Sequence, residues 1–195
     1  MDMILASRSP RRRALLEQIG LKGFKVVSPD MDEHVEGNPS PAQLVEELSL
    51  RKAQAVRAGA DEDDLIIAAD TVVVLDGAVL GKPEDEREAF AMLSALSGNS
   101  HRVYTGVTVL QGDRAVTGHE ETRVTFRELE PEEISHYIAT GEPMDKAGAY
   151  GIQGLGALLV SGIDGDYFNV MGLPVFRLGQ MLTGFGVDVL ALAAE

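Results

Sequence analysis

Two groups of charged residues could do chemistry in this sequence. The cations of interest are Arg11, Arg12, Arg13, Lys52, Lys82 and Lys146, and the carboxylates are Asp32, Glu33 and Asp70. Phosphoryl chemistry uses such a combination, because carboxylates hold a hard metal ion and orient or deprotonate water while Lys and Arg bind the anion. These residue types therefore indicate metal-assisted phosphate hydrolysis, although spacing alone does not show that they converge.

The three arginines begin a predicted helix. Ser9 suits the N-cap and Pro10 the first helical position, and the apolar pattern continues to Ile19 and stops at Gly20. The free N–H groups and the dipole of a helix start attract anions, so three arginines here oppose the dipole. A bound anion would remove that conflict. The alternative is a solvated basic turn that pairs with surface carboxylates.

Asp70 interrupts the most apolar stretch of the chain, residues 65–75, which we predict to be a central strand. An ionised carboxylate there is costly unless it binds a cation or is hydrogen-bonded. We interpret Asp70 as a catalytic or metal-binding carboxylate, with a structural Asp that caps a turn as the alternative. Lys52 falls on the inward arc of a helix predicted over residues 41–58, so it needs a partner or an exit to solvent.

Two glycine-containing segments follow. Gly81 and Pro83 fix the backbone around Lys82, which is left as the only functional group there. Residues 143–154 contain too much glycine for the interior of a helix or strand. Such loops allow the backbone to approach a ligand closely, but turns alone would also use glycine.

The remaining patterns predict a mixed α/β protein with hairpins that is not doubly wound. We expect strands at 3–6, 24–27, 65–75, 78–80, 103–110 and through 124–126, and a late hairpin of 158–160 and 167–170 joined through Asp164 and Gly165. Ser40 and Gln43 form a capping box for the helix at 41–58, and Asp76-Gly77 is a hairpin turn. Further helices are expected at 10–19, from Asp85 to 96, at 131–140 and, as the last one, from Pro174.

Composition limits the class of protein. The 195 residues suit one domain, or two lobes that share one sheet, and the net charge of −14 disfavours nucleic acid and anionic membranes. There is no cysteine and no apolar run near the roughly 20 residues that span a bilayer, so we expect a cytoplasmic protein. The four histidines are scattered without zinc-ligand spacing, and no P-loop, G-x-S-x-G or G-x-G-x-x-G motif is found.

At residues 5–16 the sequence LASRSPRRRALL resembles the opening signature of the Maf nucleotide pyrophosphatases. The resemblance continues in order over nearly the whole chain, at residues 32–33, 52–53, 69–72, 81–83, 96–98, 145–154, 164–167 and 170–174. Each block alone is modest, but together they are highly specific. Arg8 departs from the pattern, since many members have a small residue there.

The resemblance implies a single Maf-like domain over residues 1–195, related to inosine triphosphatase-like folds. Its expected features are an extended, twisted mixed sheet flanked by helices, an active-site cleft between two lobes, and often a homodimer. The implied reaction is hydrolysis of dTTP and UTP, and of modified pyrimidine nucleotides, to the monophosphate and pyrophosphate with Mg²⁺ or Mn²⁺. No nucleic-acid or membrane partner is expected.

Residue roles follow from the matching positions. Asp70 matches the general base and, with Glu33, is expected to hold the metal; Lys52, Lys82 and Glu33 match the polar catalytic ring. The resemblance assigns substrate binding to Ser7, Arg11, Arg12, Thr71 and Gln153, of which Arg12, Thr71 and Gln153 are linked to pyrimidine choice. Arg13 is expected to be dispensable. The alternatives are a 7-methyl-GTP pyrophosphatase of the same family, which Gln153 argues against, and a low-activity nucleotide-binding regulator of septum formation.

Overall fold

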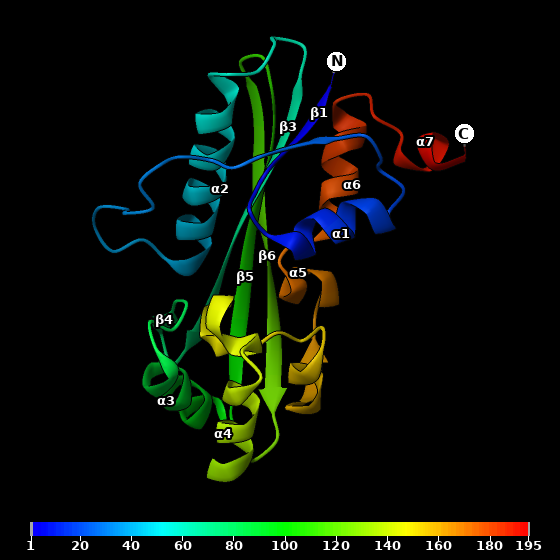
Figure 1. Cartoon of the computed structure of the whole chain (residues 1–195). Helices are drawn as coiled ribbons and strands as arrows, with labels where there is room; N and C mark the ends of the chain where they lie inside the picture. The colour runs from blue at the N-terminus through cyan, green and yellow to red at the C-terminus, as the bar shows by residue number, and fades with distance from the viewer. Residues whose placement is uncertain (1, 195) are drawn as a thin grey trace. The chain divides into compact units, whose positions relative to one another are not determined.

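The structure is a computed structural model that describes residues 2–194 (Figure 1). The strands are β1 Met3–Ala6, β2 Lys25–Val27, β3 Leu65–Leu75, β4 Ala78–Leu80, β5 Ser100–Gln111, β6 Arg114–Phe126 and β7 Val160–Asp164. The helices are α1 Pro10–Gln18, α2 Pro41–Arg57, α3 Glu86–Leu96, α4 Pro131–Ala139, α5 Tyr167–Met171, α6 Val175–Gly184 and α7 Val189–Ala194. Short 3₁₀ helices follow α4, at η1 Glu142–Asp145, η2 Ala147–Ala149 and η3 Leu155–Leu158.

The strands form one mixed sheet in the order β2-β1-β3-β5-β6-β7, and β4 pairs with β3. β1 runs parallel to both β2 and β3, whereas the β3–β4 and β6–β7 pairs are antiparallel. This arrangement confirms the predicted mixed α/β class with hairpins. Among the described residues, no helix is both long and apolar enough to span a bilayer.

The chain divides into two compact units. Unit 1 comprises residues 1–70, 105–120 and 172–195, and unit 2 comprises residues 71–104 and 121–171. β3, β5 and β6 contribute residues to both units, and the division within β3 falls between Asp70 and Thr71. The single domain over residues 1–195 and the cleft between lobes stay predictions.

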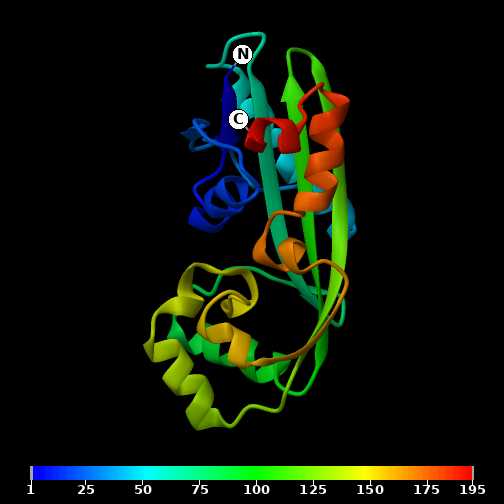
Figure 2. The same ribbon diagram turned by 90° about the vertical axis from the view of Figure 1, so that its right-hand side faces the viewer.

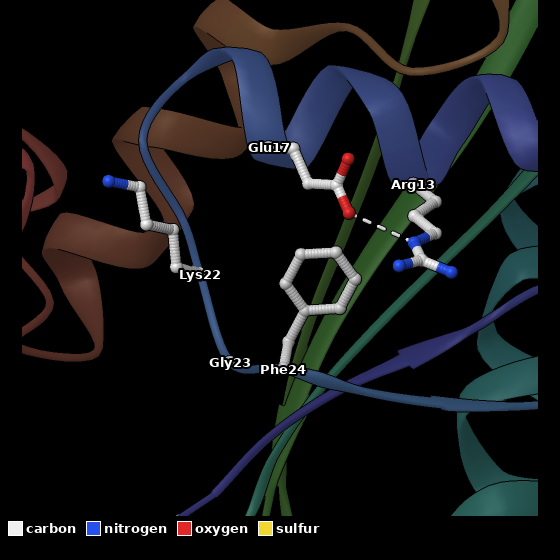
Figure 3. A pocket seen from close by; sticks show the side chains of 5 residues that line it. All are labelled: Arg13, Glu17, Lys22, Gly23 and Phe24. Carbon is white, nitrogen blue, oxygen red and sulfur yellow. Dashed lines mark hydrogen bonds and ion pairs between the residues drawn. The ribbon is translucent and has the colours of Figure 1, made fainter.

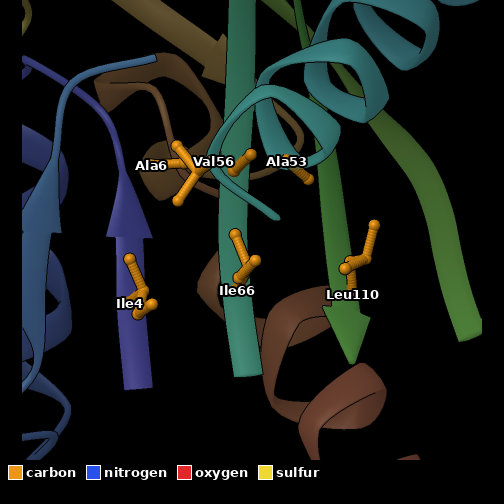
Figure 4. Packing of buried hydrophobic residues seen from close by; sticks show 7 residues of the cluster. Ile4, Ala6, Ala53, Val56, Ile66 and Leu110 are labelled. Atoms are coloured by element: carbon orange, nitrogen blue, oxygen red, sulfur yellow. The ribbon is translucent and has the colours of Figure 1, made fainter. Parts of the chain in front are cut away.

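In unit 1, α2 covers one face of β1 and β3 (Figure 4). The cluster consists of Ile4, Ala6, Ala53, Val56, Ile66, Ala68 and Leu110. Side chains alternate along a strand, so Asp70 follows Ile66 and Ala68 on the face that α2 covers. Lys52 directly precedes Ala53 on α2. The apolar packing therefore places a lysine and a carboxylate on facing elements.

Other helices cover the opposite face of the same strands. Leu5 and Ile67 alternate with the residues of the α2 cluster and are fully buried. α1 and α6 lie on this side in Figures 1 and 2, and each contributes fully buried leucines, among them Leu15 and Leu178. The sheet of unit 1 is thus packed on both faces, as predicted for β3.

Local signals explain most helix starts. The predicted capping box of α2 is present, with the Ser40 hydroxyl accepting from the Gln43 N–H and the Gln43 side chain accepting from the Ser40 N–H. α1 differs, because Ser9 stands at its N-cap without a side-chain cap bond. The Ser9 N–H instead donates to the Ser7 hydroxyl at 3.1 Å, which holds the turn before the helix.

Unit 2 surrounds a buried aromatic cluster. The His101, Phe126 and Tyr150 rings meet edge to face with centroids 4.7–5.3 Å apart. His101 Nε2 and the Tyr150 hydroxyl are 2.7 Å apart, while His101 Nδ1 is buried with no hydrogen-bond partner among residues 2–194. Burial lowers the pKa of His101 from 6.5 to about 4, so the ring is neutral at pH 7.

The predicted late hairpin is wrong. Residues 160–164 form β7, which pairs with β6, but residues 167–171 form α5 instead of a returning strand. The cause is polar anchoring: Asn169 is fully buried and donates to the Val103 carbonyl at 3.0 Å and to the Thr122 hydroxyl at 2.9 Å. The Asp166 carboxylate also accepts from the Phe168 N–H at 2.8 Å at the start of the helix.

The helix that follows Pro174 is also not the last one. α7 follows α6, and the Asp188 carboxylate accepts from the Leu190 and Ala191 N–H groups, both at 3.1 Å. Asp at an N-cap before an apolar run is a signal that the sequence contains. The remaining predicted strands and helices are confirmed, with β5 and β6 longer than expected.

The buried neutral His101 makes stability depend on pH. Its pKa is about 4 in the folded protein and near 6.5 in the unfolded chain, so the unfolded chain binds one more proton between these values. This contribution is complete above pH 6.5 and is lost as the pH falls through 4. We expect His101→Leu to flatten the decrease in unfolding free energy over that range, measured by urea unfolding. His136→Leu, at an exposed histidine of α4, is the control and should keep the native slope; equal slopes in all three proteins would contradict the prediction.

Candidate active site

A buried ion pair lies at the centre of the site. Lys52 Nζ lies 2.5 Å from Asp70 Oδ1, and the two side chains are 10% and 11% exposed. The same ammonium lies 2.9 Å from Glu33 Oε1, whose side chain is 65% exposed. Lys52 thus bridges one buried and one exposed carboxylate. The sequence left two possibilities for Lys52, a charged partner or an exit to solvent, and the structure shows charged partners.

The ion pair reduces the free-energy cost of burying the charge of each residue. A single buried charge is strongly unfavourable, and an opposite charge with a short hydrogen bond offsets much of that cost. Lys52 is directed to Asp70 because α2 packs through Ala53 and Val56 on the strand that carries Asp70. Gly106 of β5 assists, since a Cβ there would come 2.1 Å from the Val45 carbonyl of α2. Only glycine permits this approach of helix to strand.

Arg12 lies within the electrostatic field of this pair. Its Nε donates to the Gly172 carbonyl at 2.7 Å, and its Nη1 makes a long contact of 3.5 Å with the buried Ser7 hydroxyl. Burial lowers the pKa of Arg12, the negative charge of Asp70 opposes that shift, and the neighbouring Arg11 adds to it. The first turn of α1 therefore brings Arg12 within electrostatic reach of the Asp70 carboxylate.

Arg13 turns to a different side of α1. It forms an exposed ion pair with Glu17 at 2.9 Å, the i,i+4 arrangement of a solvated helix face. Both line a hollow of about 430 Å³ with Lys22, Gly23 and Phe24 (Figure 3). None of the predicted site residues lines this hollow. The solvated alternative therefore holds for Arg13 but not for Arg12. Arg8 is likewise engaged elsewhere, because its Nε donates to the Ser28 hydroxyl.

Three predicted site residues belong to unit 2. Thr71 is partly buried, and Lys82 and Gln153 are exposed. The Gly148 N–H donates to the Gly81 carbonyl at 3.0 Å, which joins the two glycine-containing segments that carry Lys82 and Gln153. Their participation in the site with Asp70 stays a prediction.

Two carboxylates of the site are placed to serve as ligands for a divalent cation. No group of three or more His, Cys, Asp or Glu residues within 2–194 could hold a metal. Asp70 and Glu33, however, share the Lys52 ammonium and so lie close together, while Asp32 is engaged with the His34 N–H at 2.9 Å. Mg²⁺ is commonly held by one or two carboxylates with substrate phosphates and water. The donor set of Asp70 and Glu33 fits such a shared site.

Sequence reasoning missed one contact of the site. The Gly172 carbonyl anchors Arg12, and a main-chain acceptor contributed by a distant segment has no residue-type signal. Two of the histidines have structural partners: His101 contacts Tyr150, and His119 Nδ1 lies 2.7 Å from Glu46.

The chain is similar to proteins of a known family. The model of a family described as Maf-like protein matches residues 2–185. A dTTP/UTP pyrophosphatase of Symbiobacterium thermophilum is 55% identical over 191 residues, and one of Moorella thermoacetica is 55% identical over 189; each match covers 96% of this chain and of the relative. A solved HAM1 protein from Coxiella burnetii is 15% identical, with a TM-score of 0.53 over 94% of this chain and 99% of that one, a likeness of fold alone.

Breaking the buried pair should cost stability. Lys52→Met keeps the length of the side chain but leaves the Asp70 carboxylate buried without its ammonium, so we expect the unfolding free energy to fall by about 3 kcal/mol. Arg13→Met removes an exposed ion pair and should cost about 0.5 kcal/mol or less. Urea unfolding at pH 7 measures both, and similar small losses in the two variants would show that the Lys52–Asp70 pair does not support the fold.

Proposed function

Because the chain belongs to the Maf-like protein family, we propose that it is a nucleoside triphosphate pyrophosphatase that hydrolyses dTTP and UTP. The products are the nucleoside monophosphate and pyrophosphate, and modified pyrimidine nucleotides are further substrates. Relatives 55% identical over nearly the whole chain bear the name dTTP/UTP pyrophosphatase. The observation that carries the proposal is the Lys52–Asp70 pair with the cationic first turn of α1 in its field.

The first turn of α1 binds the phosphates in this proposal. Arg11 and Arg12 are neighbours of like charge, and the charge of Arg11 disfavours the charged form of Arg12. A triphosphate placed at the N-terminus of α1 offsets this repulsion and interacts favourably with the helix dipole. The Ser7 hydroxyl, which already accepts from the Ser9 N–H, is available to donate to a phosphate oxygen.

Asp70 acts as the general base. Its carboxylate accepts a proton from water, and the water oxygen forms a bond to the α-phosphorus. The α–β phosphoanhydride bond then breaks as pyrophosphate leaves. Lys52 holds Asp70 in place and, with Lys82, stabilises the charge that develops on the phosphates. When bound by Asp70 and Glu33, Mg²⁺ or Mn²⁺ supplies further neutralisation of phosphate charge.

In this proposal Arg12, Thr71 and Gln153 select the nucleotide base.

We also propose that the 195 residues work as a single domain, that two copies form a homodimer, and that the enzyme acts in the cytoplasm, where nucleoside triphosphates are found. Neither nucleic acid nor a membrane is a partner, which agrees with a net charge of −14.

The proposal is tested first at Asp70. We expect the purified protein with Mg²⁺ to release pyrophosphate from dTTP and UTP faster than from 7-methyl-GTP. Asp70→Asn keeps the shape but cannot accept the proton from water, so kcat should fall about 10²-fold or more. Pyrophosphate release over this substrate panel is the measurement.

Asp63→Asn is the matched control, because it removes an exposed carboxylate before β3 and should leave kcat unchanged. Full activity of Asp70→Asn would contradict the assignment of the base. Fastest turnover of 7-methyl-GTP would replace the substrate class, and tight nucleotide binding without turnover would replace the enzyme with a binding protein.

A second test separates neighbouring arginines. Arg12 contacts Gly172 and lies in the field of Asp70, whereas Arg13 pairs with Glu17 on the exposed side of α1. We expect Arg12→Ala to change the ranking of dTTP, UTP and other nucleotides by kcat/KM, and Arg13→Ala to leave it as it is. Thermal unfolding of both variants controls for loss of fold, and equal losses in both would contradict the division.

A further inference from the structure

The carboxylate of Glu142, which none of the roles above uses, accepts three hydrogen bonds. Its Oε1 accepts from the Tyr137 hydroxyl at 2.8 Å and from the Gly156 N–H at 2.9 Å. Its Oε2 accepts from the Leu155 N–H at 3.0 Å. Glu142 begins η1 just after α4, so one side chain binds Tyr137 of α4 and a segment more than ten residues later in the chain.

The same carboxylate also reaches the beginning of that segment. The Tyr137 hydroxyl that donates to Glu142 accepts from the Gly151 N–H at 3.2 Å. Residues 151–156 are therefore tied at one end through Tyr137 and at the other directly to Glu142. Gln153 stands in the middle of this segment and is exposed.

Glycine makes this close packing possible. Gly154 has a φ of +109°, and a Cβ there would lie 2.8 Å from Glu142 Oε2. A Cβ on Gly156 would lie 2.1 Å from the Gly151 carbonyl and 2.7 Å from the Tyr137 hydroxyl. The segment therefore folds tightly around the carboxylate: Gly156 is required by its close contacts and Gly154 by its positive φ.

The carboxylate is held in its charged form. Burial alone would raise the pKa of Glu142, but the N–H groups of Gly156 and Leu155 and the Tyr137 hydroxyl outweigh it and lower the pKa. The Lys146 ammonium donates to the main-chain carbonyl of Glu142 at 2.6 Å and adds a nearby positive charge. At neutral pH both oxygens are therefore acceptors, as the three donors require.

We propose that Glu142 is a positioning residue for recognition of the nucleotide base, because it fixes residues 151–156 and thereby the place of Gln153. Glu142 does not touch the substrate and acts only through this segment. The inference rests on the proposed function, in which Gln153 helps to choose the base.

Glu142→Gln is the sharpest test. The amide keeps the size of the side chain but replaces one acceptor oxygen with an NH₂ group, which cannot accept from the N–H donors of the segment. We expect KM for dTTP and UTP to rise about 10-fold with kcat changed less than about 2-fold, since a bond to a charged acceptor is lost far from the reacting atoms. Tyr137→Phe, which removes the link to Gly151, should shift KM in the same direction.

A double-variant cycle with Gln153→Ala asks whether Glu142 acts through Gln153. We expect Glu142→Gln to raise KM strongly in the native background and little in Gln153→Ala. Additive effects on KM, or an unchanged KM in a folded Glu142→Gln, would overturn the proposal. Glu132→Gln, at an exposed glutamate of α4, is the matched control and should leave KM unchanged.

Hydrogen–deuterium exchange supplies a readout without activity. Faster exchange in Glu142→Gln confined to residues 151–156 supports positioning, whereas faster exchange throughout unit 2 shows a merely structural role and overturns it. If the native protein does not release pyrophosphate from dTTP or UTP, the proposed function fails. The exchange measurement then still decides whether Glu142 fixes the segment.

Discussion

The buried charge pair of Lys52 and Asp70 is the constraint on which unit 1 depends. Neither residue is tolerable alone among the apolar side chains that join α2 to the sheet, so each requires the other in place. The register of α2 on β3 is therefore set by polar as well as apolar contacts. Gly106 serves the same end, since a side chain there would push Val45 and its helix away from the sheet. Removing one partner of such a pair leaves an uncompensated buried charge, so its loss costs more stability than the intact pair contributes in net terms.

The arginine-rich turn extends the same electrostatic balance. Burial and Arg11 both disfavour the charge on Arg12, and Asp70 and Glu33 favour it. The negative charges of Asp70 and Glu33 thus offset part of the repulsion between the neighbouring cations. Arg13 shows the contrast, because a single exposed glutamate one turn later suffices to accommodate it. The two arginines are adjacent in the chain but lie on different sides of the helix, so Arg12 is partly buried and Arg13 is exposed.

The sequence predicted the elements whose signals are local. The bounds of β3, the capping box of α2 and the Asp76-Gly77 turn follow from neighbouring residues and are confirmed. α5 was mistaken for a strand because Asn169 is stabilised by Val103 and Thr122, which are 66 and 47 residues away. In the site, the inward lysine and the strand carboxylate were recognised by type. The contact between Lys52 and Asp70 depends on how α2 packs on β3, and the separation of the two residues in the sequence does not predict it.

Two carboxylates of this chain show how partners decide what an acid can do. Glu142 accepts hydrogen bonds from main-chain N–H groups, which move only if the backbone moves. Its negative charge therefore serves to hold the backbone in place. Asp70 is bound by a lysine side chain that it shares with the exposed Glu33. An ammonium on a flexible stem can shift towards an arriving phosphate and expose a carboxylate oxygen to water or a cation. The proposed roles of the two acids, general base for Asp70 and positioning residue for Glu142, therefore rest on this difference in partner rather than on burial alone.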